Sequence, residues 1–131
     1  MAETQRPEEL AERVRHAVDS ADTAAMADLL HPNAKWGAPD DPKPSCQNRR
    51  QVLDWYQQSR ERGVGARVTE VEVRGDKILV GMKVAGRSPD GEPGAEVDRW
   101  QVMTVVDGQI ADIRGFEGRD EAAVRAGVQD H

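Results

Sequence analysis

The stretch EVDRWQVMTVVDGQIADIRGFEG, residues 96–118, contains the strongest turn signal of the chain. Apolar and polar residues alternate on both sides of the pair Asp107-Gly108. Asp-Gly favours a two-residue type I′ turn, because both positions of that turn need positive φ angles. The pattern therefore predicts a β-hairpin in which Val106 faces Gln109 and Trp100 faces Gly115.

The predicted register assigns the side chains of this hairpin to two faces. One face is apolar in its middle, so we expect it to be the inner face; its first strand contributes Asp98, Trp100, Val102 and Thr104. The other face is charged at its centre and is expected to be the outer one; it contains Arg99, Gln101, Met103, Val105, Ile110, Asp112, Arg114 and Phe116. Trp100 then lies over Gly115, where the missing side chain leaves room for an indole.

The same register places Asp98 directly across from Glu117 at the far end of the inner face. Like charges at facing positions are destabilising unless they are neutralised. A shared proton would raise the pKa of one carboxyl and make it a candidate general acid or base. The alternative is that both carboxylates are solvated at the rim of the sheet and have no function. A β-bulge before Trp100 would move every residue upstream of it to the opposite face.

A second hairpin precedes this one. In residues 67–85, the pair Gly75-Asp76 separates two strands in which Val73 faces Ile78 and Val71 faces Val80. The N-terminal half is helical in pattern, with an apolar stripe at Leu10, Val14, Ala17 and Ala21 and further helices starting near Asp22 and Asn48. A short strand carries Trp36, and residues 119–127 form a closing helix. This order predicts an α+β domain with helices over a curved antiparallel sheet.

Composition narrows the functional classes. The chain has 131 residues, which suits a single domain over 1–131. Its net charge is −6 and its Lys and Arg are scattered among acids, so neither nucleic acid nor an anionic membrane is an expected partner. One cysteine, Cys46, excludes an internal disulfide, and the three histidines are too scattered for a metal site. Without a signal peptide or apolar span, we expect a soluble, cytoplasmic protein that needs no cofactor.

Aromatic and thioether side chains are the candidate pocket lining. Trp36, Tyr56, Met82 and Trp100 would form a wall suited to a flat apolar ligand. Trp55 and Met26 lie on helical stripes, and the alternative for the whole group is that these side chains simply fill the core. Asp40 and Asp41 lie in a proline-rich loop at the expected pocket mouth, where they favour a turn over a catalytic base.

Three motifs, ADLLHPNAKW, NRRQVLDWY and DRWQVMTVVDGQIADIRGFEGRDEAAVRAG, together resemble a SnoaL-like domain of the nuclear transport factor 2-like superfamily. The resemblance extends from about Leu10 to Gly127. It implies a sheet wrapped around the N-terminal helices as a cone with an internal pocket. Related proteins include steroid isomerases, polyketide cyclases, epoxide hydrolases and non-catalytic binding or dimerising domains, so the fold does not decide the function.

The enzyme members can be compared by residue. The catalytic aspartate of the isomerases matches Ala38 or Pro39, and their proton-donating acid matches Trp100. The cyclases' sheet histidine has no counterpart, because His16, His31 and His131 lie off the predicted strands. The epoxide hydrolases' Asp-Arg-Asp set finds similar chemical types in Asp98, Arg99 and Glu117, but Arg99 is predicted on the face opposite the two acids.

Three functional hypotheses follow. The first is a pocket protein that binds a small apolar or polycyclic molecule without a complete catalytic set. The second is a small isomerase, cyclase or epoxide-hydrolase-like enzyme that uses Asp98 and Glu117. The third is a homodimer formed through the outer sheet face, whose apolar centre would contain Met103, Val105, Ile110 and Phe116.

Overall fold

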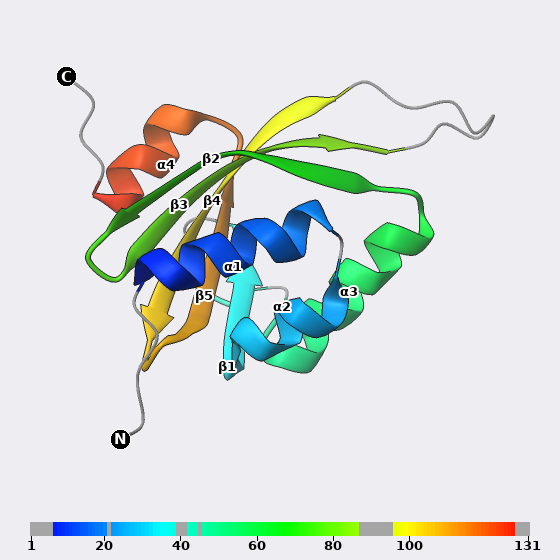
Figure 1. The fold of residues 1–131 in the computed structure, drawn as a ribbon, viewed down its shortest axis with the longest axis horizontal. Helices are drawn as coiled ribbons and strands as arrows, with labels where there is room; N and C mark the ends of the chain where they lie inside the picture. Colours follow the sequence, from blue (N-terminus) through cyan, green and yellow to red (C-terminus); the bar gives the residue numbers. More distant parts are fainter. Residues whose placement is uncertain (1–6, 21, 39–41, 45, 87–95, 128–131) are drawn as a thin grey trace.

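The computed structural model describes residues 7–20, 22–38, 42–44, 46–86 and 96–127. Within these residues, helices and strands follow the predicted order (Figure 1). The elements are α1 (Pro7–Asp19), α2 (Thr23–Leu29), β1 (Leu30–Gly37), α3 (Arg49–Glu61), β2 (Gly65–Arg74), β3 (Lys77–Ala85), β4 (Val97–Val106), β5 (Gln109–Phe116) and α4 (Arg119–Ala126). Of the residues named above, Ala21, Pro39, Asp40, Asp41 and His131 lie outside the described residues.

The helices begin at the predicted caps. The side chain of Asp22 accepts a hydrogen bond from the backbone N–H of Ala25 at 3.0 Å, and Asn48 accepts one from Gln51 at 3.0 Å. Each bond satisfies a backbone donor that the first turn of a helix leaves without an internal partner. Gly63, with φ 81°, follows α3 and permits the left-handed turn that ends the helix.

The five strands of the described chain form one mixed sheet in the order β1-β5-β4-β3-β2. Strands β2 to β5 are antiparallel neighbours, as predicted, whereas β1 pairs with β5 in parallel. A parallel neighbour requires a crossover connection. Here α3 and the two hairpins intervene between β1 and β5, so the first strand joins the sheet beside the last.

Both predicted hairpin turns are confirmed. Asp107 and Gly108 have φ angles of 53° and 78°, and Gly75 has 58°. The predicted pairing also holds next to the turns, where Val105 faces Ile110 and Val71 faces Val80. Two-residue connections with positive φ match the right-handed twist of the strands they join.

Farther from the turn, the predicted register of the last hairpin is wrong. The pairing shifts between Thr104 and Val105, so that Gln101 faces Gly115 and Trp100 faces Phe116. Ala111 is the extra residue on β5. A bulge of this kind bends the strand and increases its local twist.

The one-residue shift brings Ile113 and Gly115 of β5 to the same face as Met103 and Gln101 of β4. Met103 and Ile113 are buried against the helices of the N-terminal half. Val102 and Phe116 instead belong to a second apolar cluster beneath α4, and Trp100 packs against it. The predicted inner face of β4 is therefore the outer one, whereas Ile113 of β5 lies on the inner face as predicted.

Helix α4 covers this outer face, on the side of the sheet opposite α1, α2 and α3 (Figure 1). Its small side chains Ala122, Ala123 and Ala126 are buried against the strands. Arg119 of α4 binds both carboxylate oxygens of Glu70, at 3.0 and 2.7 Å, and so ties the helix to β2.

This arrangement corrects the predicted dimer contact. Met103 and Ile110 are completely buried on the face covered by the N-terminal helices, and Phe116 lies beneath α4 with 6% of its surface exposed. Because one chain already buries these side chains, they cannot form the centre of a homodimer interface. Homodimerisation itself stays a prediction without an assigned surface.

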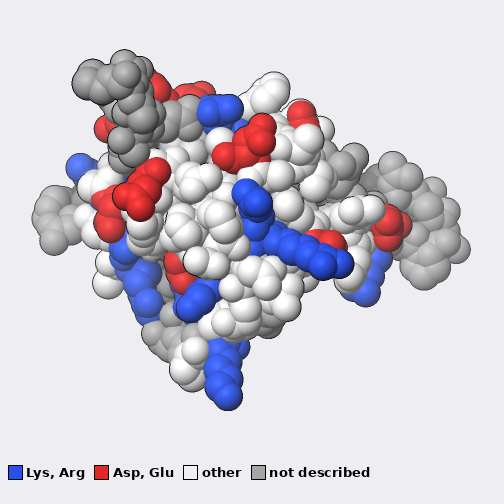
Figure 2. Space-filling model, turned by 90° about the horizontal axis from the view of Figure 1, so that it is seen from below, with Lys and Arg blue, Asp and Glu red and all other residues white. Residues whose placement is uncertain are grey.

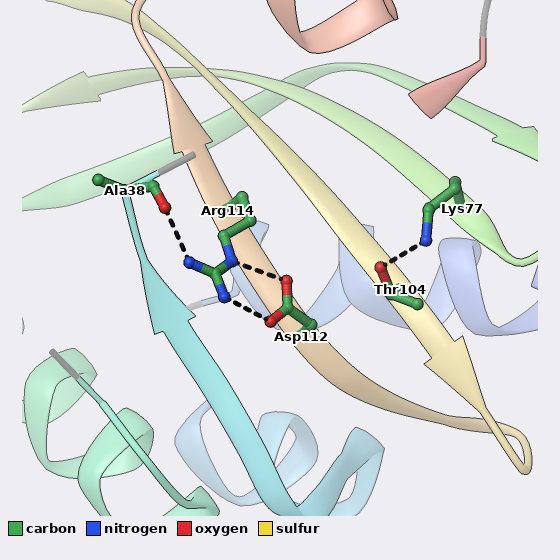
Figure 3. A network of polar contacts seen from close by, with 5 residues as sticks. All are labelled: Ala38, Lys77, Thr104, Asp112 and Arg114. Atoms are coloured by element: carbon green, nitrogen blue, oxygen red, sulfur yellow. Dashed lines mark hydrogen bonds and ion pairs between the residues drawn. The ribbon is translucent and has the colours of Figure 1, made fainter. Parts of the chain in front are cut away.

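Polar contacts fix the end of β1 beside β5 (Figure 3). Arg114 donates two hydrogen bonds to the carboxylate of Asp112, at 3.0 and 3.2 Å, and a third to the carbonyl of Ala38 at 2.9 Å. Farther along the same face, the ammonium of Lys77 donates to the hydroxyl of Thr104 at 3.0 Å. The Arg114 contacts hold the chain where it leaves β1, and thereby fix the position of Trp36.

Charged residues of both signs are interspersed over the face seen in Figure 2. Along the sequence, 18 Lys and Arg accompany 24 Asp and Glu. The visible surface therefore has no continuous block of positive charge.

Candidate functional site

A cavity of about 610 Å³ lies between α1, α2 and α3 and the concave face of the sheet. Helices and strands contribute apolar walls, which include Val18, Met26, Trp36, Trp55, Tyr56, Val64, Ala66, Met82 and Val84. The polar residues that border it are Asp22, Thr23, Ser59, Arg62, Arg99, Gln101 and Glu117. A mostly apolar cavity of this size with a few polar groups has the character of a small-molecule site.

Three aromatic rings form one wall of the cavity. The ring centroid of Trp36 on β1 lies 4.2 Å from that of Trp55 and 5.0 Å from that of Tyr56, both on α3. Trp55 and Tyr56 meet edge to face at 5.6 Å. Trp55 is 45% exposed although it lines the cavity, which places a large aromatic surface at the opening.

Trp36, Tyr56 and Met82 occupy the cavity wall where the sequence analysis expects a lining. The side chains of Tyr56 and Met82 can be oriented from the helical spacing of α3 and the alternation along β3, since both periodicities are regular at these positions. Their role in binding a ligand stays a prediction.

Trp100 does not point into the cavity as predicted. Trp100 borders the cavity, but its ring packs on the outer face of the sheet, over Gly81 of β3. A Cβ atom on Gly81 would approach Cζ3 of this ring to 2.2 Å. The guanidinium of Arg119 lies over the ring, 5.9 Å from its centroid. A register without the bulge in β5 places the charged Asp112 and Arg114 on the same face as Met103. With the bulge, Ile113 and Gly115 share that face instead, so it is apolar and faces the cavity, and Trp100 lies on the opposite, α4 side.

The predicted acid pair does not form. Asp98 lies on the outer face, where its carboxylate accepts a hydrogen bond from Lys83 at 3.1 Å. Glu117 is exposed and borders the cavity. With the two carboxylates on different faces, they cannot share a proton, and Asp98 is not available to a molecule in the cavity.

Arg99 and Gln101 are the residues that the predicted register misplaces. Both were expected on the outer face, and both border the cavity instead. Arg99 thus lies on the same side of the sheet as Glu117, contrary to the prediction that separated them. A sequence signal for the exchange exists in α4, because the small residues Ala122, Ala123 and Ala126 indicate a second apolar sheet face that needs a cover.

Two buried polar atoms of the cavity wall have no hydrogen-bond partner among the described residues: the hydroxyl of Tyr56 and Oε1 of Gln101. Burial raises the pKa of the Tyr56 hydroxyl, and the nearby Cys46 thiol adds to the increase. Burial also raises the pKa of the Cys46 thiol. Both groups are therefore neutral at neutral pH, and the deep part of the cavity is uncharged at these positions.

The other candidates do not contribute to the cavity. His16 is exposed on α1, and Nδ1 of His31 accepts a hydrogen bond from the backbone of Asn33 at 3.0 Å. Cys46 is buried beside Trp36, with which it forms an isolated β-bridge. No group of three or more metal-binding side chains occurs in the described part of the chain.

These features define an α+β domain in which helices cover a curved sheet and an apolar cavity lies on the concave side of that sheet. The sequence profile of the SnoaL-like domain matches residues 11–113. The chain therefore belongs to the SnoaL-like domain family, and the predicted resemblance is confirmed.

Solved structures support the same fold. A protein named as a polyketide cyclase from Sinorhizobium meliloti is 28% identical, with a TM-score of 0.66 over 82% of this chain and 94% of that one. A SnoaL-like polyketide cyclase, so named, from Jannaschia sp. CCS1 is 18% identical, with a TM-score of 0.68 over 95% and 96%. An epoxide hydrolase/cyclase-like enzyme of pyran ring formation in the polyether salinomycin is 17% identical, with a TM-score of 0.70 over 86% and 91%.

The predicted nuclear transport factor 2-like architecture is confirmed by a further match. A protein from Catenulispora acidiphila with a ketosteroid isomerase-like fold is 13% identical, with a TM-score of 0.67 over 95% of this chain and 96% of that one.

No curated protein matches the sequence at a significant level. Across the described residues, no helix is both long enough and apolar enough to cross a bilayer.

Proposed function

We propose that this chain binds a small, mostly apolar molecule between α3 and the concave face of the sheet. The observation that carries the proposal is the aromatic wall of Trp36, Trp55 and Tyr56, which borders a cavity of about 610 Å³. Flat ligands gain both buried apolar area and ring contacts against such a wall. The similar proteins named as polyketide cyclases agree with this kind of ligand.

Trp55 offers a direct test of this proposal. Because its side chain is 45% exposed, Trp55→Ala removes cavity wall at a small cost in folding stability. We expect naphthalene to bind the unmodified protein and to change the fluorescence of Trp36 and Trp55. Truncation of Trp55 should weaken this binding about tenfold, since it removes much of one aromatic contact surface.

A matched control is Val124→Ala, because Val124 is 80% exposed on α4, outside the cavity lining. This variant should bind naphthalene as the unmodified protein does. Equal binding by Trp55→Ala and the unmodified protein, or no binding by either, would contradict the proposal. If Trp55→Ala binds naphthalene more weakly as expected, mass spectrometry of small molecules that copurify with the protein would identify the natural ligand class.

A second candidate function is chemistry on the bound molecule. Glu117 and Arg99 both border the cavity, where a carboxylate could activate water and a guanidinium could polarise an oxygen of a substrate. The enzyme hypothesis now depends on Glu117 without Asp98. Incubation with an aromatic epoxide, such as styrene oxide, tests it: diol formation that is lost in Glu117→Gln supports an enzyme. Equal product in both samples rules Glu117 out.

A further inference from the structure

Gln101 is the only polar residue that is buried in the described part of the chain, with 7% of its surface exposed. It lies on β4, on the cavity side of the sheet, between Arg99 and Met103. Buried polar groups are normally hydrogen-bonded, so an exception needs a physical explanation.

The sheet itself cannot satisfy this side chain. The residues that face Gln101 on the neighbouring strands are Val80 on β3 and Gly115 on β5. Neither has a side chain that can donate or accept a hydrogen bond. Oε1 of Gln101 is accordingly without a partner among the described residues. Gly115 also leaves open space beside the amide, because a Cβ atom added there would meet only Trp36 Nε1, at 3.9 Å.

An unpaired buried amide works against folding, whereas a leucine of similar size would add apolar contacts at the same position. The fold therefore gains nothing from the polarity of Gln101. A molecule in the cavity can gain from it, because the amide of Gln101 is a hydrogen-bonding group in an apolar wall and disfavours ligands that would leave it unpaired.

We infer that Gln101 determines specificity, by forming a hydrogen bond with a neutral hydroxyl group on an otherwise apolar ligand. This inference rests on the proposed binding function and deepens it. A hydroxyl both donates and accepts, so it can satisfy either end of the Gln101 amide. Tyr56 lines the same cavity, and its buried hydroxyl also has no partner among the described residues.

The charges around the cavity favour a neutral group at this position. Burial keeps the Tyr56 hydroxyl protonated, because it raises the pKa of that group. The cations that border the cavity, Arg62 and Arg99, are exposed residues, and Arg99 donates a hydrogen bond to the carbonyl of Asp98 at 3.1 Å. A ligand carboxylate beside Gln101 would lose its hydration without a buried cation in exchange.

Naphthalene and 2-naphthol form a probe pair that differs by one hydroxyl. Binding of each is measured by tryptophan fluorescence in the unmodified protein, in Gln101→Leu and in Tyr56→Phe. We expect Gln101→Leu to weaken 2-naphthol binding about tenfold, the effect of one buried hydrogen bond. Naphthalene should bind this variant at least as tightly as before. Tyr56→Phe should give the same pattern with a smaller loss.

Thermal unfolding separates this role from a structural one. The midpoint of Gln101→Leu should be no lower than that of the unmodified protein, because no hydrogen bond within the protein is lost. Gln57→Leu, at an exposed position of α3, is the control and should change neither probe's affinity. A clear fall in the Gln101→Leu midpoint would show instead that the amide supports the fold.

The probe pair also distinguishes the two proposals. If naphthalene binds but Gln101→Leu leaves the affinity for 2-naphthol unchanged, the specificity role is wrong and the binding function stands. If Gln101→Leu weakens both probes equally, the residue only shapes the cavity, and the inference is likewise wrong. If neither probe binds the unmodified protein, both proposals fail.

Discussion

Tyr56 is the only tyrosine of the chain, so its ionisation can be followed without interference from another phenol. Its hydroxyl is buried and has no hydrogen-bond partner among the described residues. Ionisation would place a negative charge in an apolar wall without a compensating donor. This cost explains why the pKa of Tyr56 lies above its ordinary value of 10.0.

The sign of the pH effect follows from this direction. Below pH 10 the hydroxyl is protonated in both the folded and the unfolded chain, and its contribution to stability is fully present. As the pH rises above about 10, the unfolded chain releases the proton first, so the free energy of unfolding falls. One such group changes that free energy by at most about 1.4 kcal/mol per pH unit.

We therefore predict that Tyr56→Phe unfolds with a shallower alkaline loss of stability than the unmodified protein. Urea unfolding at pH 9 to 11 measures the loss, and the ultraviolet absorbance of tyrosinate gives the pKa of the folded state. A folded-state pKa at or below that of the urea-unfolded chain would contradict the burial of this hydroxyl.

Strands β3 and β4 show how one packing contact orders the outer layer of the molecule. The ring of Trp100 on β4 lies over Gly81 on β3 and beneath Arg119 of α4. We predict that Gly81→Ala lowers the free energy of unfolding by about 2–3 kcal/mol, because a Cβ atom there forces the indole out of place. Urea unfolding gives the value.

Gly65→Ala is the matched control for this substitution. It lies at the start of β2, and a Cβ atom there would have no other atom within 4 Å. Its effect should be within about 0.5 kcal/mol of zero. A similar loss for both variants would mean that glycine flexibility, rather than the Trp100 contact, determines the result.

The same strands show which parts of the fold the sequence can predict. Asp107-Gly108 and Gly75-Asp76 are recognisable because two-residue turns require residues that tolerate positive φ, at both positions of the first turn and at Gly75 in the second. The bulges that follow have no comparable requirement: the unpaired residues, Thr69 and Ala111, are ordinary strand residues. Both bulges depend on the curvature of the complete sheet, which a short segment of sequence does not determine.

The predictions for the site differ in the same way. Trp36, Tyr56 and Met82 lie within β1, α3 and β3 and are in the cavity wall as expected. A register without the bulge places Asp112 and Arg114 on the same face as Met103, and this charge leads to the wrong assignment of the β4 faces. Asp98, Arg99 and Trp100 are therefore all reversed. The principle that a glycine makes room for Trp100 is correct, but the glycine is Gly81 of the neighbouring strand rather than Gly115.

At the scale of the whole molecule, one sheet separates two apolar clusters. Ile78 belongs to the cluster beneath the N-terminal helices, and its neighbour Leu79 belongs to the cluster beneath α4. Met103 and Val102 on β4 are divided between the clusters in the same way. Because adjacent residues of the same strands contribute to both, neither cluster can be lost while the other keeps its strands in place.

This shared sheet predicts that the molecule unfolds as one cooperative unit, and its three tryptophans allow a test on both faces. Trp100→Phe leaves Trp36 and Trp55 as reporters of the cavity side, whereas the double variant Trp36→Phe, Trp55→Phe leaves Trp100 as a reporter beneath α4. In each variant, the urea midpoint from fluorescence should equal the midpoint from far-ultraviolet circular dichroism, even if the substitutions shift both. A lower fluorescence midpoint in the double variant alone would mean that α4 and its cluster detach before the sheet unfolds. Agreement in both variants would show that the strands transmit stability between the outer layer and the cavity.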